Sequence, residues 1–511
     1  MPARPADGDP AGDVIDASGE LRIRGHQFPA ANTAIPHLLD FPAWVNERQR
    51  EFLQGSMRVD LFGIRAGGTI DGRLSAPLGA DGPSLEPGRR YLLEAVVRTV
   101  GLGHLFTQGT ADSNEVWVEL RLTAGDRVIG TSGGVGEAGR VDPWAHFVNA
   151  YVLDRQANRI DRRNPQDIFT MLYNHQIPPG AADTLHYAFT VPEDLDGPVE
   201  AEVRLHYRKF DTTYMRHFQD AGFDGNDLPV VTLASDRVVF PVGSADARDA
   251  GAPAGDEPPA WERWNDFGIG LLRKGGKGQL RQAEAAFRAV ADHGRPDGLV
   301  NLARVYLREG RVSEAAAVLR RAADHEPPGR PWVIAWLSGQ VNRQRGELEA
   351  AANDYRSLVD NAYPEATARG FDFSLDYRVL NELGIVRFQQ ARRASGAQAE
   401  AYHDAAVHRF EQVLGIDPEN RTAHYNLARI HDWRGDDERA RRHWTQYARY
   451  KPDDNARDKV VAAHRRVDAP ADHAAEDVVI YDLQRPGRPD DPVATLQAPH
   501  LRADVAAQAE P

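Results

Sequence analysis

The central part of the chain is marked by apolar residues at every second position. In one stretch Val199, Ala201, Val203, Leu205 and Tyr207 alternate with Glu200, Glu202, Arg204, His206 and Arg208. A period of two places successive side chains on opposite faces of a strand. The pattern therefore predicts a half-buried β-strand over 199–208.

The same alternation occurs over 115–122, where Trp117 falls on the polar side. An Ala-Gly-Asp turn and a second strand from 127 follow, which predicts a hairpin. Further strand-like runs lie between Gly, Pro and Asp clusters, at 57–64, 90–100, 146–153, 184–191 and 230–242. Seven or more short strands without intervening helices predict an antiparallel β-sandwich over 56–242.

A helical repeat follows the strands, and its signature is a spacing of 34 residues. This spacing joins Ala406 to Ala440, Phe410 to Trp444 and Pro418 to Pro452. Small residues and aromatics at such positions are typical of tetratricopeptide (TPR) helix pairs, which stack into a solenoid. We therefore predict a multidomain β and α protein whose TPR domain covers 261–467 in about five units, one of them lengthened by 391–404.

The segments around these two domains have a different composition. Residues 1–55 are rich in Pro, Gly, Ala and Asp and contain one short amphipathic stretch at 42–55, which predicts a disordered lead-in and a short helix. Small residues, Pro and acids make 243–260 a linker. Residues 468–511 are expected to be a disordered tail with one short extended piece at 478–483.

Polar side chains on the first helix of each TPR pair line a concave groove and are candidate partner contacts. In the repeat register these are Asn301, Arg304, Arg308, Asn426 and Arg429. They are suited to grip a peptide carboxylate or an acidic segment through charge-assisted hydrogen bonds. The alternative is that they are solvated groove surface, because helix repeats always expose some Asn and Arg.

Composition excludes several classes of function. The chain of 511 residues has a formal net charge of −14, which opposes nucleic acid as a partner. No apolar run approaches the roughly 18 residues of a membrane span. The chain has no cysteine, so it has no disulfide and no covalently attached haem c. The first residues contain no secretory signal, which leaves the compartment unknown.

Catalytic motifs are weak. Ser132 lies in a GxSxG string at 130–134, but Gly and Pro follow where a nucleophile elbow needs a helix. No HExxH, P-loop or EF-hand string occurs, so no metal ligands are assigned. We expect no catalytic activity in this chain. A hydrolase built on Ser132 is the weakest of the function classes considered.

Four strings carry a family resemblance: HQFPAANTAIP (26–36), GHLFTQGT (103–110), NHQIPPG (174–180) and YRKFD (207–211). Together with the TPR repeats they resemble the part that follows the haem domain in bacterial multihaem c-type cytochromes of the cytochrome c-554 type. Thr107 departs from the family, which has Pro there. The resemblance implies a periplasmic protein associated with electron transfer, with haem c on an upstream domain or on a partner.

Two functions follow. The first is a TPR protein-binding scaffold associated with a periplasmic multihaem cytochrome system, and the second is the C-terminal portion of such an oxidoreductase without its haem-binding part. His26, His104 and His175 are candidate haem contacts, because imidazole is a common axial ligand. The alternative is that each histidine holds a loop by hydrogen bonds inside the sandwich.

Overall fold

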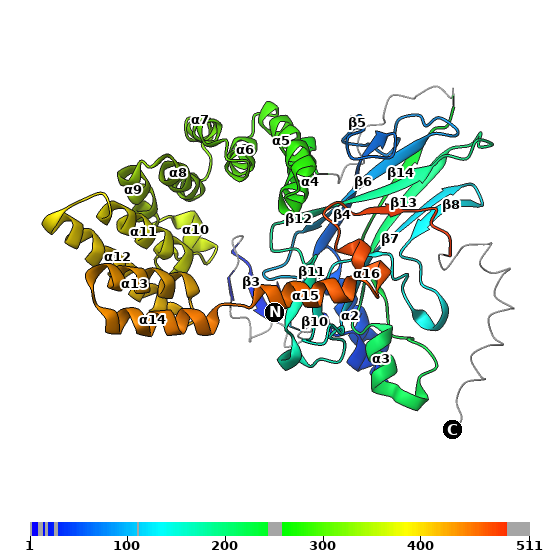
Figure 1. Cartoon of the computed structure of the whole chain (residues 1–511). Helices are drawn as coiled ribbons and strands as arrows, with labels where there is room; N and C mark the ends of the chain where they lie inside the picture. Colours follow the sequence, from blue (N-terminus) through cyan, green and yellow to red (C-terminus); the bar gives the residue numbers. More distant parts are fainter. Residues whose placement is uncertain are drawn as a thin grey trace. The chain divides into compact units, whose positions relative to one another are not determined.

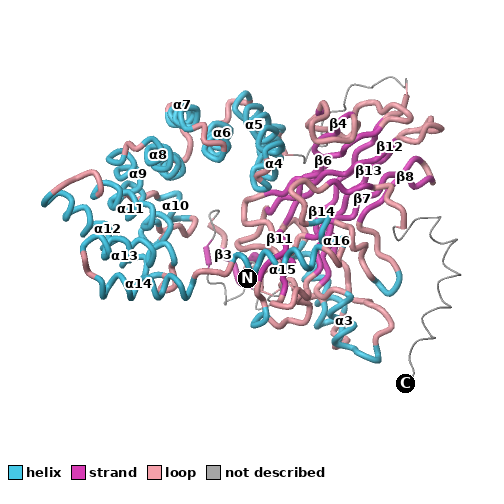
Figure 2. The backbone as a smooth tube through the Cα atoms, viewed as in Figure 1, coloured by secondary structure: helices cyan, strands magenta, loops and turns pink. Residues whose placement is uncertain are grey.

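The computed structural model describes residues 3–8, 14–15, 19–24, 29–109, 112–243 and 258–487. The chain divides into two compact units, which we call the strand-rich unit (1–278 with 457–511) and the helical unit (279–456). Figure 2 shows strands concentrated in the first and helices in the second. The predicted fold class, antiparallel sheets followed by a helical repeat, is confirmed.

Two five-stranded sheets form the strand-rich unit (Figure 1). The first has the order β15-β12-β6-β4-β5, with bounds Ile480–Asp482, Ala182–Thr190, Arg90–Thr99, Met57–Ala66 and Leu74–Ser75. The second has the order β14-β13-β7-β8, with β9 also paired to β7, and bounds Val231–Phe240, Val199–Arg208, Glu115–Ala124, Arg127–Ser132 and His146–Phe147. These sheets therefore contain the predicted strands, except that the run 146–153 divides and only its first two residues, β9, belong to them.

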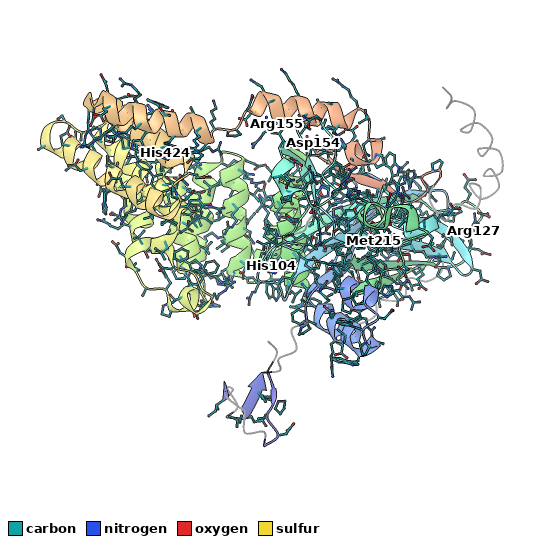
Figure 3. The ribbon with its side chains drawn as sticks, turned by 90° about the horizontal axis from the view of Figure 1, so that it is seen from below. His104, Arg127, Asp154, Arg155, Met215 and His424 are labelled. Carbon is teal, nitrogen blue, oxygen red and sulfur yellow. The ribbon has the colours of Figure 1, made fainter. Side chains whose placement is uncertain are left out.

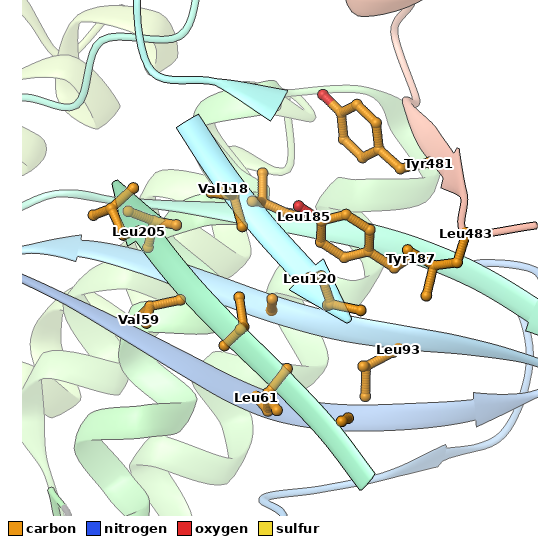
Figure 4. Close-up of a cluster of buried hydrophobic side chains, with 14 of the residues drawn as sticks. Val59, Leu61, Leu93, Val118, Leu120, Leu185, Tyr187, Leu205, Tyr481 and Leu483 are labelled. Carbon is orange, nitrogen blue, oxygen red and sulfur yellow. The ribbon is translucent and has the colours of Figure 1, made fainter. Parts of the chain in front are cut away.

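The core lies between the two sheets, where the alternating apolar residues meet. Val203 and Leu205 of β13 are fully buried, as the period of two predicts. Figure 4 shows the side chains of Leu61 on β4, Leu93 on β6 and Leu120 on β7 in the same cluster. Burial of this contiguous apolar surface is the main stabilisation of the unit.

Trp117 was predicted on the polar side of its strand, and it is nevertheless completely buried. Residues after β8 fold back over this face, so that the ring packs with Val141 and Ala145. Its indole N–H donates to the carbonyl oxygen of Gly133 at 3.0 Å. The covering loop therefore converts an outward position into a second, smaller core.

The lead-in differs from the predicted disorder. Its described residues include a small antiparallel sheet of β1 (Ala3–Pro5), β3 (Leu21–Arg24) and β2 (Val14–Ile15). Backbone pairing of this kind needs no long apolar run, so composition did not reveal it. The predicted short helix is present as α2 (Ala43–Leu53), preceded by α1 (Ala34–Leu38).

Helix α4 (Ala260–Lys274) was predicted to open the TPR domain, but it packs on the sheet of the strand-rich unit. Phe267 stacks on Phe62 of β4 with ring centroids 4.4 Å apart. Gly270 permits the close approach, because a Cβ there would lie 2.2 Å from Thr184 Oγ1. The strand-rich unit therefore extends past the predicted linker, most of which lies outside the described residues.

The predicted disordered tail contains ordered structure up to residue 487. After α15 (Asp454–Arg465) come α16 (Ala469–Ala474) and strand β15, which pairs in parallel with β12. Val479, Tyr481 and Leu483 are 6%, 4% and 0% exposed and join the sandwich core. The predicted extended piece at 478–483 is thus a strand of the first sheet.

Two further strands, β10 (Ala150–Leu153) and β11 (Thr170–Asn174), pair with each other, and α3 (Thr212–Gln219) follows β13. The helical unit contains α6 (Pro296–Arg308), α7 (Val312–Ala323), α8 (Pro331–Arg345), α9 (Leu348–Asp360), α10 (Pro364–Ala368), α11 (Tyr377–Ala391), α12 (Gly396–Ile416), α13 (Arg421–Arg434) and α14 (Asp437–Tyr450). Helix α5 (Lys277–Asp292) precedes them. The segment 391–404 forms a loop and the first turns of α12.

Consecutive helices of this unit pack in pairs, α6 on α7, α8 on α9, α11 on α12 and α13 on α14. Small residues allow the contact, as the repeat pattern predicts: a Cβ on Gly339 would lie 2.5 Å from the Tyr355 ring, and one on Gly384 would lie 2.8 Å from Phe410. The aromatic ring of one helix therefore occupies the space that glycine leaves on its neighbour.

Candidate functional site

The five candidate partner contacts lie on two helices of the helical unit. Asn301, Arg304 and Arg308 are on α6, at a spacing that places them on one helix face, while Asn426 and Arg429 are on α13. Arg308 is exposed and Asn301 is half-buried. Arg304 has a different environment from both, because it lines a pocket.

This pocket, which we call the aromatic pocket, has a volume of about 290 Å³. Helices α6, α8, α9 and α11 and the connection 361–376 contribute its walls. The lining residues are Arg304, Trp332, Val333, Trp336, Leu358, Phe371, Phe373, Asp376, Arg378 and Val379. The pocket therefore combines large apolar surfaces with two guanidinium groups and one carboxylate.

The aromatic walls support one another. The ring centroid of Tyr363 lies 6.0 Å from that of Trp332 and 6.1 Å from that of Phe373, both in edge-to-face geometry. The ring centroids of Trp336 and Tyr355 are 5.6 Å apart. Phe371 remains half exposed although it is parallel to Phe373. An exposed ring beside buried ones is typical of a surface that receives an apolar group.

Arg304 is half-buried, and this burial lowers its pKa. Within the described part of the chain its guanidinium has no hydrogen-bond or ion-pair partner. A buried cation is normally paired, because desolvation of a charge is costly. Arg378 also has no side-chain partner among the described residues, and the single carboxylate, Asp376, caps the backbone of α11. The pocket is therefore cationic in a strongly acidic chain.

The candidates on α13 have other roles. The Asn426 side chain is buried and donates to the carbonyl oxygen of Thr422, one turn earlier, at 2.8 Å. Arg429 is exposed and lies over aromatic rings, with its guanidinium carbon 5.6 Å from the centroid of Tyr425 and 5.8 Å from that of Phe388. Arg429 is open to a partner, whereas the Asn426 amide is occupied by its own helix.

Another polar cluster joins α13 to α14. His424 Nδ1 and His443 Nδ1 are 3.0 Å apart, and His424 Nε2 is 3.0 Å from the carbonyl oxygen of Pro418 (His424 is labelled in Figure 3). His424 therefore donates through Nε2 and accepts at Nδ1 from His443. Burial, with the neighbouring His424 and His431, lowers the pKa of His443 to about 4, so the His443 ring is neutral at pH 7.

The candidate haem contacts lie in the strand-rich unit. His104 is exposed in its loop, with Nδ1 2.9 Å from the carbonyl oxygen of Leu105 (Figure 3). His175 is stacked between His146 and Tyr173, with ring centroids 4.9 and 4.3 Å away, and burial lowers its pKa to about 4. His26 lies outside the described residues.

The structure brings the four resemblance strings together. Phe106 forms an antiparallel bridge with Ile177, and the Gln176 side-chain amide donates to the Thr107 carbonyl oxygen. Phe106 also packs on Tyr207 at 5.6 Å, and the Tyr207 hydroxyl donates to the carbonyl oxygen of Ala31. The described parts of the four strings therefore form one contiguous group at one end of the sandwich.

The remaining candidates from the sequence are the serine of the GxSxG string, metal-binding side chains and membrane-spanning helices. Ser132 lies in strand β8 and is 5% exposed, and the next element is a single 3-10 turn (Glu137–Gly139), not the α-helix that a nucleophile elbow needs. No group of three or more His, Asp or Glu side chains in the described residues is placed to hold a metal ion. None of the helices described is long and apolar enough to cross a membrane.

Sequence reasoning found Arg304 from the repeat register but missed the aromatic walls of its pocket. The available signal was the string Phe371-Asp372-Phe373, in a connection of about 16 residues between α9 and α11 that is longer than a TPR turn requires. Long connections in a solenoid often carry binding residues.

Two family models match the chain, both described as tetratricopeptide repeat. They cover residues 272–331 and 397–463. The TPR prediction is thereby confirmed, and the helical region is a protein-interaction module. Neither model describes a cytochrome. The absence of cysteine excludes covalent haem c from this chain.

Solved structures similar to part of the chain include a crystal structure of the MamA protein, with 18% identity over 37% of this chain and 91% of that chain and a TM-score of 0.28. Another is MamA AMB-1, with 20% identity over 37% of this chain and 90% of that chain and a TM-score of 0.28. No curated protein sequence matches.

Proposed function

We propose that the helical unit is a docking module for a protein segment that carries an acidic group next to an apolar side chain. The observation that carries this proposal is the half-buried Arg304 guanidinium, which has no ionic partner among the described residues and shares a pocket with Trp332 and Trp336. A carboxylate bound there would replace the hydrogen bonds that burial removed.

The aromatic pocket explains why the segment also needs an apolar side chain. Its volume of about 290 Å³ is near the lower limit of small-molecule sites, which suits one large side chain. Buried tryptophan and arginine are the residues that most often dominate the binding energy of an interface. Asn301 and Arg308 on the same helix, and Arg429 on α13 three helix pairs further on, are proposed to contact the segment beyond the pocket, whereas the amide of the fifth candidate, Asn426, is occupied by its own helix.

The test uses the full chain and fluorescent ten-residue peptides. We expect a peptide of alternating Phe and Asp to bind, and the matched peptides of alternating Phe and Lys or Ser and Asp to bind much more weakly. Arg304→Ala should weaken binding at least about tenfold, because hydrogen bonds to charged groups contribute about 1.5–3 kcal/mol. Arg320→Ala, an exposed arginine on α7, is the control. Equal binding of the Phe-Lys peptide would refute the proposal.

The finer function, association with a periplasmic multihaem cytochrome, stays a prediction that rests on the resemblance. Its motif residues His104 and His175 lie in the strand-rich unit. Titration with a multihaem partner, comparing the wild type with a His26→Ala, His104→Ala double variant, tests it. An unchanged Soret spectrum on substitution would exclude these histidines as haem ligands.

A further inference from the structure

A second cavity, of about 490 Å³, lies in the strand-rich unit and is lined by none of the predicted site residues. Strands β7, β10 and β11 contribute Glu115, Tyr151 and Tyr173, and the C-terminal stretch 467–474 supplies another wall. Its size is that of pockets that enclose a small molecule. We call it the tyrosine cavity.

The buried charges at this cavity are paired with one another, and Arg140, the other charged residue of its lining, is exposed. Arg208 Nε donates to the Glu115 carboxylate at 2.8 Å, and Arg159 contacts Asp211 at 3.2 Å. Asp468 accepts from the Tyr151 hydroxyl at 3.0 Å. A ligand of either charge would compete with existing ion pairs, so the cavity favours a ligand without net charge.

Two buried amide side chains at the cavity are left without partners. Asn114 and Asn149 are each 7% exposed, and within the described residues the side-chain oxygen of neither accepts a hydrogen bond. The ring of Tyr173 is half-buried, and its hydroxyl makes no hydrogen bond among the described residues. Buried polar groups are almost always hydrogen-bonded, so the two amides indicate that a ligand supplies the missing partners.

The missing partners define the ligand. Amide groups and a phenol offer both donors and acceptors. A ligand hydroxyl group can pair with either kind, because it donates one hydrogen bond and accepts two. The rings of Tyr151 and Tyr173, with centroids 5.3 Å apart, offer apolar faces for C–H groups. We propose that the tyrosine cavity binds a neutral polyhydroxylated ligand, a mono- or disaccharide.

Calorimetric titration of the full chain tests this with glucose, galactose, mannose, N-acetylglucosamine, maltose and cellobiose, and with spermidine and citrate as charged probes. We expect at least one saccharide to bind and to raise the melting temperature. Tyr173→Phe, which keeps the ring, and Asn149→Leu should each weaken that binding about tenfold. Arg320→Ala, at an exposed side chain of the helical unit, is the control.

Three results would overturn the proposal. One is that no saccharide of the set binds. Another is that a saccharide binds equally to wild type and to both variants. The third is that spermidine or citrate binds and the saccharides do not. Because Tyr173→Phe removes a single oxygen, retained folding of this variant keeps the test decisive even if Asn149→Leu fails to fold.

Discussion

The Tyr151 hydroxyl donates a hydrogen bond of 3.0 Å to the carboxylate of Asp468, a residue 317 positions further along the chain. His464 Nε2 lies 3.0 Å from the same hydroxyl. These contacts hold the C-terminal stretch on β10, and β15 then continues the first sheet. The C-terminal stretch is therefore a structural part of the strand-rich unit and forms a wall of the tyrosine cavity.

The first prediction concerns this stretch. Leu483 is fully buried and packs closely on Gly130. A Cβ added to Gly130 would lie 2.8 Å from the Cβ of Leu483. Leu483→Ala should lower the free energy of unfolding by about 2–5 kcal/mol, because it removes methyl groups and leaves a cavity. Urea unfolding measures this. Val467→Ala, at a side chain 80% exposed, is the control and should change it by less than about 0.5 kcal/mol.

The second prediction compares two glycines inside helices. Gly339→Ala should destabilise the helical unit by about 1–3 kcal/mol, because the new methyl group would lie 2.5 Å from the Tyr355 ring. Gly415→Ala on α12 meets no atom within 4 Å and should stabilise by about 0.5–1 kcal/mol, since alanine is the better helix former. Thermal unfolding of both variants measures the difference, and effects of equal sign would contradict the packing described.

The architecture could be predicted where periodicity alone decides it. The alternation in β13 and the 34-residue spacing of Phe410 and Trp444 each report a local structure and the face it buries. Helix α4 shows the limit. Its Phe267 fits the large position of a TPR helix, but a large apolar residue serves equally to pack on a sheet. A pattern identifies the buried face and leaves its partner undetermined.

The C-terminal strand and the aromatic pocket could not be predicted for a related reason. Tyr481 and Leu483 alternate over too few residues to stand out from a tail rich in Pro and Asp. Arg304 was found because the repeat assigns its face, whereas Phe371 and Phe373 lie in a connection that has no period. Their approach to Trp332 depends on the path of that connection, which composition does not determine.

The third prediction concerns how protonation of Glu115 makes the folding stability depend on pH. Burial, which outweighs the Arg208 guanidinium, raises the pKa of Glu115 from 4.5 to about 7. The folded chain therefore holds this proton more tightly than the unfolded chain. The stabilisation that protonated Glu115 contributes to the folded state is fully present below pH 4.5, and it is lost as the pH rises through 7.

Glu115→Gln removes this titration while keeping a hydrogen-bond acceptor for Arg208. The quantity to follow is the difference in unfolding free energy between wild type and variant. We expect this difference to fall by roughly 3 kcal/mol between pH 4 and pH 8, because each unit of pKa shift corresponds to about 1.36 kcal/mol. Denaturant unfolding at several pH values measures it, with Glu193→Gln, an exposed carboxylate, as control. A pH-independent difference would contradict the raised pKa.

The fourth prediction separates stability from binding at Arg304. If this half-buried guanidinium is kept for a partner, its burial is a cost to the free protein, because a partly desolvated cation without a counter-ion disfavours folding. Arg304→Met keeps the apolar stem and removes the charge. It should raise the free energy of unfolding by about 0.5–2 kcal/mol while it abolishes binding of the Phe-Asp peptide.

The control is Arg311→Met, because Arg311 is bonded to Glu284, Glu309 and Glu314. Removing that guanidinium breaks an ion-pair network and should lower the stability of the helical unit without changing peptide affinity. Thermal unfolding and fluorescence anisotropy on the same samples give both quantities. If Arg304→Met were as destabilising as Arg311→Met, Arg304 would be a structural residue, and the unpaired guanidinium would no longer indicate an acidic partner.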